Sequence, residues 1–224
     1  MTQVATSPNQ LLSALQASLT VAHDGTLTVR DAARLRTEGA AIIAWSAAFS
    51  TDEATVKSAQ WLARSAAAAS GIYSASTAPL YAARAKGAYE GLSVPAINLR
   101  AQVFDMARTA LECAARLDGA ALIFELARSE QTYTFQRPVD YATSVFAAAI
   151  AAGWHGPLFI QGDHYQFVAK KYAADPDAVT TEIARACHLA VEADYRNIDI
   201  DASTLVDLSH ADVSEQQRVN VERS

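Results

Sequence analysis

An Asp-His pair and two later aspartates are the residues of this sequence whose types and spacing most clearly indicate chemistry. Asp163 and His164 follow an apolar run, and Asp199 and Asp201 lie two apart in a later one. A neutral imidazole is the commonest metal ligand, and an adjacent carboxylate can move a proton or support that ligand. Carboxylates at positions i and i+2 of a strand face the same side. Because inward-facing carboxylates need a cation or hydrogen-bond donors, the pattern predicts a metal or acid–base site.

The same residues also have a purely structural interpretation. His164 can cap a strand and hydrogen-bond to the loop, and the two aspartates can form a solvated strand end before an N-capping Ser203 or Thr204. The position of His164 after a buried strand, on the same expected edge as Asp199 and Asp201, favours a functional role. The other histidines are expected to be structural; they are His23, His155, His188 and His210.

Short apolar segments alternate with helical ones from Ser93 onward, and these elements must position the polar residues. The expected strands are Val94–Leu99, Ala120–Leu126, Pro157–Gln161 and Asn197–Asp201. The expected helices are Ala101–Leu117, Pro138–Ala152, Asp177–Ala193 and a last one that starts at Ser214. The alternation of strands and helices at this interval predicts βα units and a parallel sheet. Because the strands are continuously apolar, both faces of that sheet are expected to be covered.

Each expected strand brings polar side chains to its carboxyl end. In chain order they are Asn98, Glu125, Asp163, His164, Asp199, Asp201 and Ser203. Right-handed crossovers place the carboxyl ends of parallel strands on one edge. Because α/β proteins and barrels hold their active sites at this edge, the sequence predicts a single site there.

The composition limits the class of protein. The chain has 224 residues, 51% of them hydrophobic, and a formal net charge of −6. It can bury a sizeable core, and its acidity argues against broad binding to nucleic acid or anionic membranes, which rely on basic patches. Cys113 and Cys187 are expected to be buried free thiols. No secretory signal is visible, and the longest apolar run, near residues 39–49, is too short to span a bilayer, so a soluble, cytoplasmic protein is expected.

Three motifs in this sequence occur in order at successive expected strand ends. They are Pro95-Ala96-Ile97-Asn98, Asp163-His164 and Ile200-Asp201-Ala202-Ser203. Together they resemble the class II, zinc-dependent fructose-bisphosphate and tagatose-bisphosphate aldolases. The resemblance covers about residues 93–224, and it is closest to a divergent aldolase-like branch with a helical extension before the barrel.

The resemblance implies a lyase that cleaves or forms a carbon–carbon bond of a ketose (bis)phosphate, with Zn2+ as its cofactor. It implies that His164 and Asp201 are metal ligands and that Asp163 moves a proton at a substrate hydroxyl. The residues expected to contact the substrate are Asn98, Glu125 and Ser203. The partner would be a small sugar phosphate, and the full-length enzyme would be a homo-oligomer.

The resemblance also implies a fold. Residues 1–92 are expected to form a helical N-terminal extension, and residues 93–224 the N-terminal half of a (β/α)8 TIM barrel, because a complete barrel takes about 250 residues. Family members supply further zinc ligands, including two more histidines, from the second half of the barrel. After Asp201 this sequence has only His210. Because a catalytic zinc site needs three protein ligands, we expect the chain by itself to be an inactive fragment.

Two other functions are compatible with the same residues. A half-barrel with an unclosed sheet has an apolar face and a free edge, which would suit a non-catalytic subunit that docks on a catalytic one or pairs with itself. Another metal-dependent barrel enzyme, a lyase or an epimerase, would use the same strand ends, since one fold hosts many chemistries.

Overall fold

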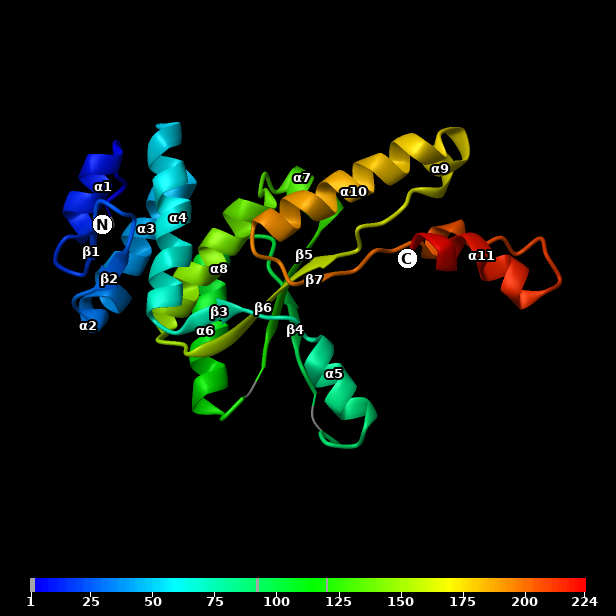
Figure 1. Cartoon of the computed structure of the whole chain (residues 1–224), viewed down its shortest axis with the longest axis horizontal. Helices are drawn as coiled ribbons and strands as arrows, with labels where there is room; N and C mark the ends of the chain where they lie inside the picture. The colour runs from blue at the N-terminus through cyan, green and yellow to red at the C-terminus, as the bar shows by residue number, and fades with distance from the viewer. Residues whose placement is uncertain (1–2, 92, 120) are drawn as a thin grey trace.

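The computed structural model describes residues 3–91, 93–119 and 121–224, and it has an α/β fold around a parallel sheet (Figure 1). Ala120, with which the second expected strand begins, lies outside the described residues, as do both ends of the expected helical extension, residues 1 and 92. The α/β class and the parallel sheet that the sequence predicts are confirmed.

The sheet has five strands in the order β3-β6-β5-β4, and β7 also pairs with β6. The bounds are β3 Ile72–Ser74, β4 Ala96–Asn98, β5 Ile123–Ala127, β6 Gly156–Asp163 and β7 Asn197–Ile198. Every pairing is parallel. Strands β4, β5, β6 and β7 therefore lie side by side in chain order, as successive βα units require. Strand β7 ends earlier than expected, at Ile198, so that Asp199 and Asp201 lie beyond it.

Strand β6 pairs with β3 near its start and with β7 near its end. The side chain of Asn197 joins these two neighbours. It accepts a hydrogen bond from the backbone N–H of Thr77 at 2.8 Å and donates to the carbonyl oxygen of Ala75 at 3.1 Å. The sequence predicts only helices before residue 93, and strand β3 corrects that expectation: part of the presumed extension belongs to the sheet.

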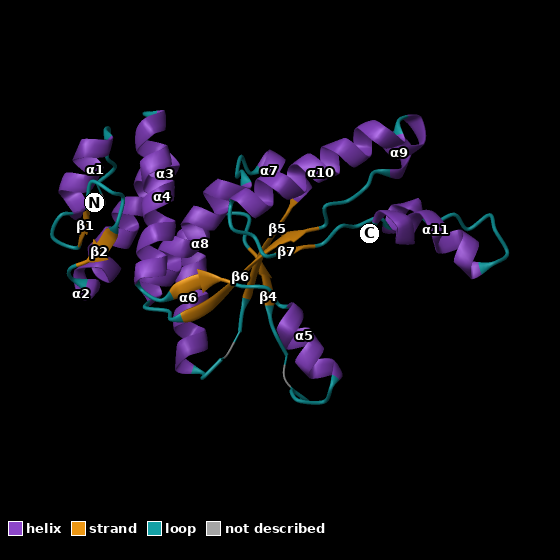
Figure 2. Ribbon diagram, viewed as in Figure 1, coloured by secondary structure: helices purple, strands orange, loops and turns teal. Residues whose placement is uncertain are grey.

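Three helices connect the strands and lie on one side of the sheet (Figures 1 and 2). They are α6 Val103–Arg116, α8 Pro138–Ala152 and α10 Pro176–Glu192. The bounds of α8 agree with the prediction at both ends, because Pro138 occupies the first turn and Gly153, with a φ of 67°, terminates the helix in the left-handed conformation. Two short helices follow β5 and β6: α7 Arg128–Tyr133 and α9 Ala169–Ala174.

The first part of the chain packs on the outer side of α8. Its helices are α1 Pro8–Leu15, α2 Ala32–Arg34, a π-helical turn Leu35–Gly39, α3 Ala40–Phe49 and α4 Glu53–Ala69. A hairpin of β1 Leu19–Val21 and β2 Leu27–Val29 separates α1 from α2. The sequence does not predict this hairpin, because each of its strands is only three residues long.

Small residues allow α3, α4 and α8 to pack closely. The buried face of α4 carries Ala59, Leu62, Ala63, Ala66 and Ala67, each at most 1% exposed. These residues share one hydrophobic core with the side chains on the helix-facing side of β5 and β6. The N-terminal helices and the sheet are therefore stabilised by the burial of a common apolar surface.

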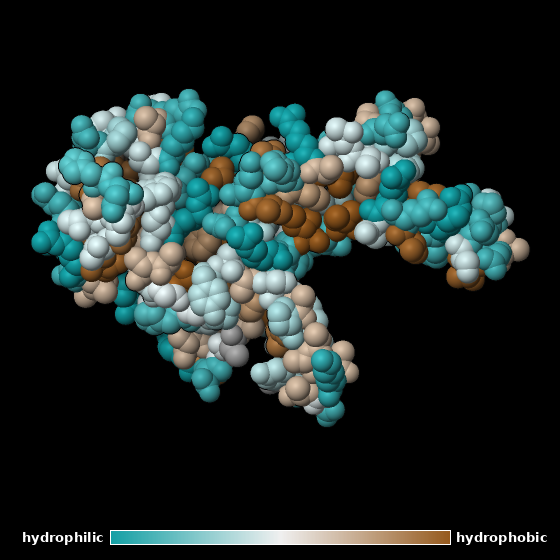
Figure 3. Space-filling view, viewed as in Figure 1, coloured by the Kyte–Doolittle hydropathy of each residue, from teal (hydrophilic) through white to brown (hydrophobic). Residues whose placement is uncertain are grey.

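Two helices project from this core without a buried residue of their own: α5 Ala78–Ala85 and α11 Val213–Arg223 (Figure 1). A 3-10 turn, Ser203–Leu205, precedes α11. Figure 3 shows apolar surface between α10 and α11, and the exposed apolar side chains in the C-terminal part of the chain include Ile200, Leu208 and Val213. None of the described helices has both the length and the apolar character needed to cross a membrane.

Candidate metal centre

A row of polar side chains crosses the sheet toward its carboxyl ends. Asn98 on β4 pairs in register with Glu125 on β5, Glu125 with Gln161 on β6, and Gln161 with Asn197 on β7. Paired residues of parallel neighbours project from the same face of a sheet, so these four side chains form one row. The next position of β6 on this face, toward the carboxyl end, is Asp163.

The same face is apolar two residues earlier along each strand. Ala96, Ile123 and Phe159 are paired in register there, and Ile123 and Phe159 are 3% and 7% exposed. The face therefore changes from apolar to polar toward the carboxyl ends of the strands. This polarity is typical of α/β proteins that hold a ligand at the carboxyl edge.

His164 lies among three carboxylates just beyond this row. Its Nε2 atom is 3.5 Å from Asp163 Oδ2, and its Nδ1 atom is 3.6 Å from both Asp199 Oδ2 and Asp201 Oδ2. These separations exceed ordinary hydrogen-bond lengths. Asp163, His164 and Asp199 each offer one ligand atom, and these atoms lie within 4.8 Å of one another. The group has the residue types and the spacing to hold a metal ion.

Backbone hydrogen bonds hold the two segments of this cluster together beyond the formal ends of β6 and β7. The N–H of Asp199 donates to the carbonyl of Gly162 at 2.8 Å, and the N–H of Tyr165 donates to the carbonyl of Asp199 at 2.8 Å. Phe167 then donates to the carbonyl of Asp201 at 2.8 Å. The loop that carries Asp163 and His164 is thus held against the segment that carries the two later aspartates.

Gly162 has a packing role in this loop. A Cβ atom at position 162 would lie 2.6 Å from the ring of Tyr165, which is fully buried. Tyr165 in turn accepts a hydrogen bond on its hydroxyl from Gln131 at 3.0 Å. Only a residue without a side chain lets the tyrosine ring pass beneath the strand at this point.

Burial changes the acidity of two carboxyl groups in the site. Desolvation, with the charge of Asp163 as a smaller contribution, raises the pKa of Glu125 above its ordinary value. Desolvation also raises the pKa of Asp163, although the neighbouring His164 works in the opposite direction. Gln161 donates a hydrogen bond to Glu125 at 3.3 Å. These two carboxyls retain a proton at higher pH than ordinary side chains of their kind.

Asp201 behaves differently because it is surrounded by donors. Its Oδ1 atom accepts hydrogen bonds from the hydroxyl of Ser203 at 2.6 Å and from the Ser203 backbone N–H at 3.0 Å, and its Oδ2 atom accepts one from Gln166 at 2.6 Å. Desolvation alone would raise the pKa of Asp201, but these hydrogen bonds outweigh it and lower the pKa below its ordinary value. Asp201 is therefore an ionised carboxylate whose oxygens are already bound.

Glu130, a polar residue after the second expected strand to which the sequence assigned no role, organises the β4 side of the site. It is 7% exposed, and it accepts hydrogen bonds from Asn98 at 2.7 Å, from the backbone N–H of Ala127 at 2.9 Å and from Arg100 at 2.6 Å. Desolvation opposes ionisation, but these donors hold the pKa of Glu130 below its ordinary value. The available signal was its position at the third residue of a helix that follows a strand, where a glutamate can reach back to the preceding backbone.

The structure brings the predicted site residues to one edge of the sheet. The residues concerned are Asn98, Glu125, Asp163, His164, Asp201 and Ser203. Asp199 and Asp201 both face His164, as their spacing predicts. Within the described residues, Asp199 joins Asp163 and His164 in the cluster that could hold an ion, while Asp201 is bound to Ser203 and Gln166. The roles assigned to the six residues stay predictions.

The fold and this cluster define an α/β protein with a parallel sheet and a candidate metal centre at its carboxyl edge. Comparisons of the chain with models of known protein families, with curated proteins and with solved structures found no match.

Proposed function

We propose that the carboxyl edge of the sheet binds a divalent metal ion and serves a lyase of the class II aldolase type. The reaction would cleave or form a carbon–carbon bond of a ketose (bis)phosphate. The observation that carries this proposal is the approach of Asp163, His164 and Asp199 to within 4.8 Å of one another. The order of the three aldolase-like motifs along the chain supports it.

The donor set suits a metal of intermediate softness. An imidazole nitrogen and two carboxylate oxygens are ligands of Zn2+ as well as of Mn2+ and Fe2+. When bound, Zn2+ supplies a Lewis acid that polarises a carbonyl oxygen. Asp163, His164 and Asp199 would be its ligands, and Asp201 would support His164 from the side of Nδ1. A catalytic zinc site needs three protein ligands, and these three side chains supply them although only one is a histidine.

The surrounding side chains supply proton transfer and substrate contacts in this proposal. Because Asp163 would be a metal ligand, Glu125, whose pKa is raised, is the group that would take up or release a proton at a substrate hydroxyl. Glu130 holds the amide nitrogen of Asn98. The buried Oδ1 atom of Asn98 has no hydrogen-bond partner among the described residues, so it is free to accept a bond from a hydroxyl. Ser203 fixes Asp201 and borders the site.

The proposed architecture is the first half of a (β/α)8 barrel. The parallel order of β4, β5, β6 and β7 along the sheet supports this assignment, as does the position of α6, α8 and α10 on a single side. In a barrel the face that carries Asn98, Glu125 and Gln161 would point inward, where such enzymes bind substrate.

Metal binding is the first test of the proposal. The metal-free chain is titrated with Zn2+, and separately with Mn2+ and Mg2+, in a calorimeter. We expect one tight Zn2+ site per chain, weakened at least about tenfold by His164→Ala and by Asp199→Asn, because each removes a ligand. The matched control is His210→Ala, which removes a histidine from an exposed pair with Asp207 at 3.5 Å. Equal Zn2+ affinity in all four proteins would overturn the site.

A second candidate function, a non-catalytic subunit, is favoured by the projecting helices α5 and α11, neither of which buries a residue. Turnover separates the two candidates. Purified chain is assayed against a panel of phosphorylated ketoses with and without a chelator. Chelator-sensitive cleavage that Asp163→Asn abolishes would support the lyase and contradict the expectation of an inactive fragment. Epimer formation would favour an epimerase, and the absence of both Zn2+ binding and turnover would favour the subunit.

A further inference from the structure

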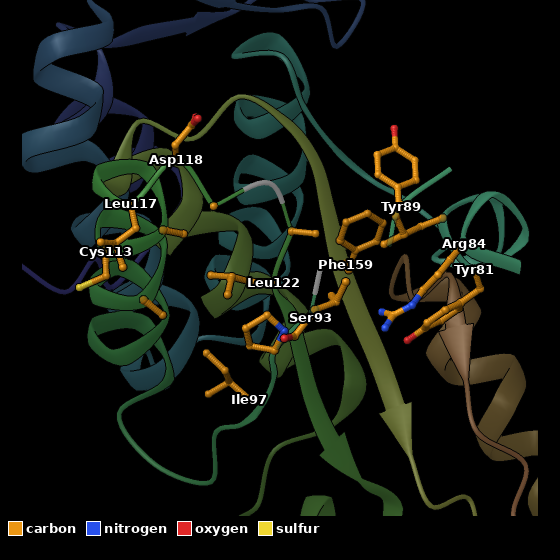
Figure 4. A pocket seen from close by; sticks show the side chains of 17 residues that line it. Tyr81, Arg84, Tyr89, Ser93, Ile97, Cys113, Leu117, Asp118, Leu122 and Phe159 are labelled. Carbon is orange, nitrogen blue, oxygen red and sulfur yellow. The ribbon is translucent and has the colours of Figure 1, made fainter. Parts of the chain in front are cut away.

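A groove of about 800 Å³ lies at the end of the sheet opposite the candidate metal centre. It is formed by α5, by α6 and by the residues that lead into β4 and β5 (Figure 4). Its volume falls within the range of small-molecule sites, roughly 300–1,000 Å³. None of the residues of the Asp163–His164–Asp199 cluster lines it. A ligand in the groove would therefore not contact the cluster that could hold a metal.

Most of the groove wall is apolar. Ile97 and Leu122 line it on the helix-facing side of the sheet, Phe159 lines it from the opposite face, and Leu117 lines the side that α6 provides (Figure 4). Cys113 on α6 also borders it and is exposed, which corrects the expectation of a buried thiol. Water in contact with these side chains is released when an apolar molecule occupies the groove, which favours binding.

The polar groups of the groove gather on α5. Tyr81 and Arg84 lie three residues apart, so they are neighbours on one face of the helix, and Tyr89 follows just beyond its end. Arg84 forms no ion pair and no side-chain hydrogen bond with another described residue. Asp118, the acidic residue of the wall, lies at the far end of the groove in Figure 4. The α5 end thus offers an unneutralised guanidinium beside a phenol hydroxyl.

The groove therefore favours a ligand that has an anionic head group at one end and an apolar body at the other. A guanidinium forms two parallel hydrogen bonds with a carboxylate, and a neighbouring phenol can donate a third. The positive charge of Arg84 would repel a cation. A compact polar anion would leave the apolar wall of the groove in contact with water. We propose that the groove binds an amphipathic monocarboxylate, with its carboxylate at Arg84 and Tyr81 and its hydrocarbon body against Leu122 and Phe159.

Calorimetric titration of the whole chain with three probes that share one tail tests this proposal. The probes are dodecanoate, dodecanol and dodecyltrimethylammonium, each below the concentration at which it forms micelles. We expect dodecanoate to bind one per chain, with about tenfold or greater preference over dodecanol, as a charge-assisted hydrogen bond requires. Equal binding of the three probes, several molecules bound per chain, or no saturable binding of dodecanoate would overturn the proposal.

Variants assign the binding to the groove. Arg84→Gln is expected to weaken dodecanoate about tenfold and to leave dodecanol unchanged, because only the charged head contacts the guanidinium. Arg185→Gln, an exposed arginine of α10 outside the groove wall, is the matched control and should bind like the unmodified chain. Ala121→Phe, which fills the groove, should weaken both probes. An Arg84→Gln protein that keeps full dodecanoate affinity would contradict the proposed head-group site.

Discussion

The carboxyl and amino ends of one parallel sheet differ in chemistry, although the same strands build both. On β6 the face that carries the polar row runs from Phe159 through Gln161 to Asp163. The amino end carries an apolar groove beside Phe159, whereas the carboxyl end carries a histidine among carboxylates whose loops are joined by hydrogen bonds. A two-residue step along a strand is enough to separate an apolar site from a polar one. The two ends should therefore respond independently to mutation.

Phe159→Ala is expected to have the largest effect, and it acts on the amino end. Phe159 is 7% exposed and lines the groove, so removal of its ring enlarges the groove and lowers the free energy of unfolding by about 3 kcal/mol, the lower end of the range for a buried phenylalanine. Urea unfolding measures this loss. Zn2+ titration of the folded variant should show unchanged affinity, because Phe159 lies one layer below the polar row. A parallel drop in Zn2+ affinity would show that the two ends are coupled.

Gly162→Ala should have a smaller effect on stability but should damage the carboxyl end. The new methyl group meets the ring of Tyr165 at 2.6 Å, and overpacking of this kind costs about 1–3 kcal/mol. Displacement of Tyr165 moves the adjoining His164, so Zn2+ affinity should also fall. The matched control is Gly119→Ala at the amino end, where the nearest atoms are 3.3–3.4 Å away. Equal Zn2+ affinities in the two variants would contradict the role given to Gly162.

Glu130→Gln tests the carboxyl end of the sheet through the pH dependence of the free energy of unfolding. The pKa of Glu130 lies below its ordinary value of 4.5, since three donors favour the charged form over the desolvation that opposes it. Its contribution to stability is therefore complete above pH 4.5 and is lost as the pH falls from there through the folded-state pKa. The variant should be about 1–2 kcal/mol less stable at neutral pH.

Unfolding measured from pH 7 to pH 3 checks this prediction. The difference in unfolding free energy between wild type and variant should shrink as the medium becomes acidic. Glu222→Gln on the exposed helix α11 is the control and should follow the wild type throughout. A wild-type/Glu130→Gln difference that stays constant across this range would show that ionisation of Glu130 adds nothing to stability.

Much of the fold could be predicted from local patterns. Helix α8 agrees with its prediction because a proline begins it and a glycine ends it. The strands β4, β5 and β6 were recognisable as apolar runs between helices. Strand β3 was not, since Ile72–Ser74 is too short for a periodicity and becomes a strand only by pairing with β6. The same reason explains the missed hairpin of β1 and β2.

The site residues were likewise found by type and position, but their partners were not. The sequence by itself determined that polar side chains follow successive strands, because parallel strands share one carboxyl edge. The tertiary structure decided which carboxylates are free, because hydrogen bonds from Ser203 and Gln166 bind Asp201 and leave Asp199 beside His164. It also decided the burial of Glu130 and the groove at Arg84. Both depend on contacts between residues distant in the chain, which no local pattern contains.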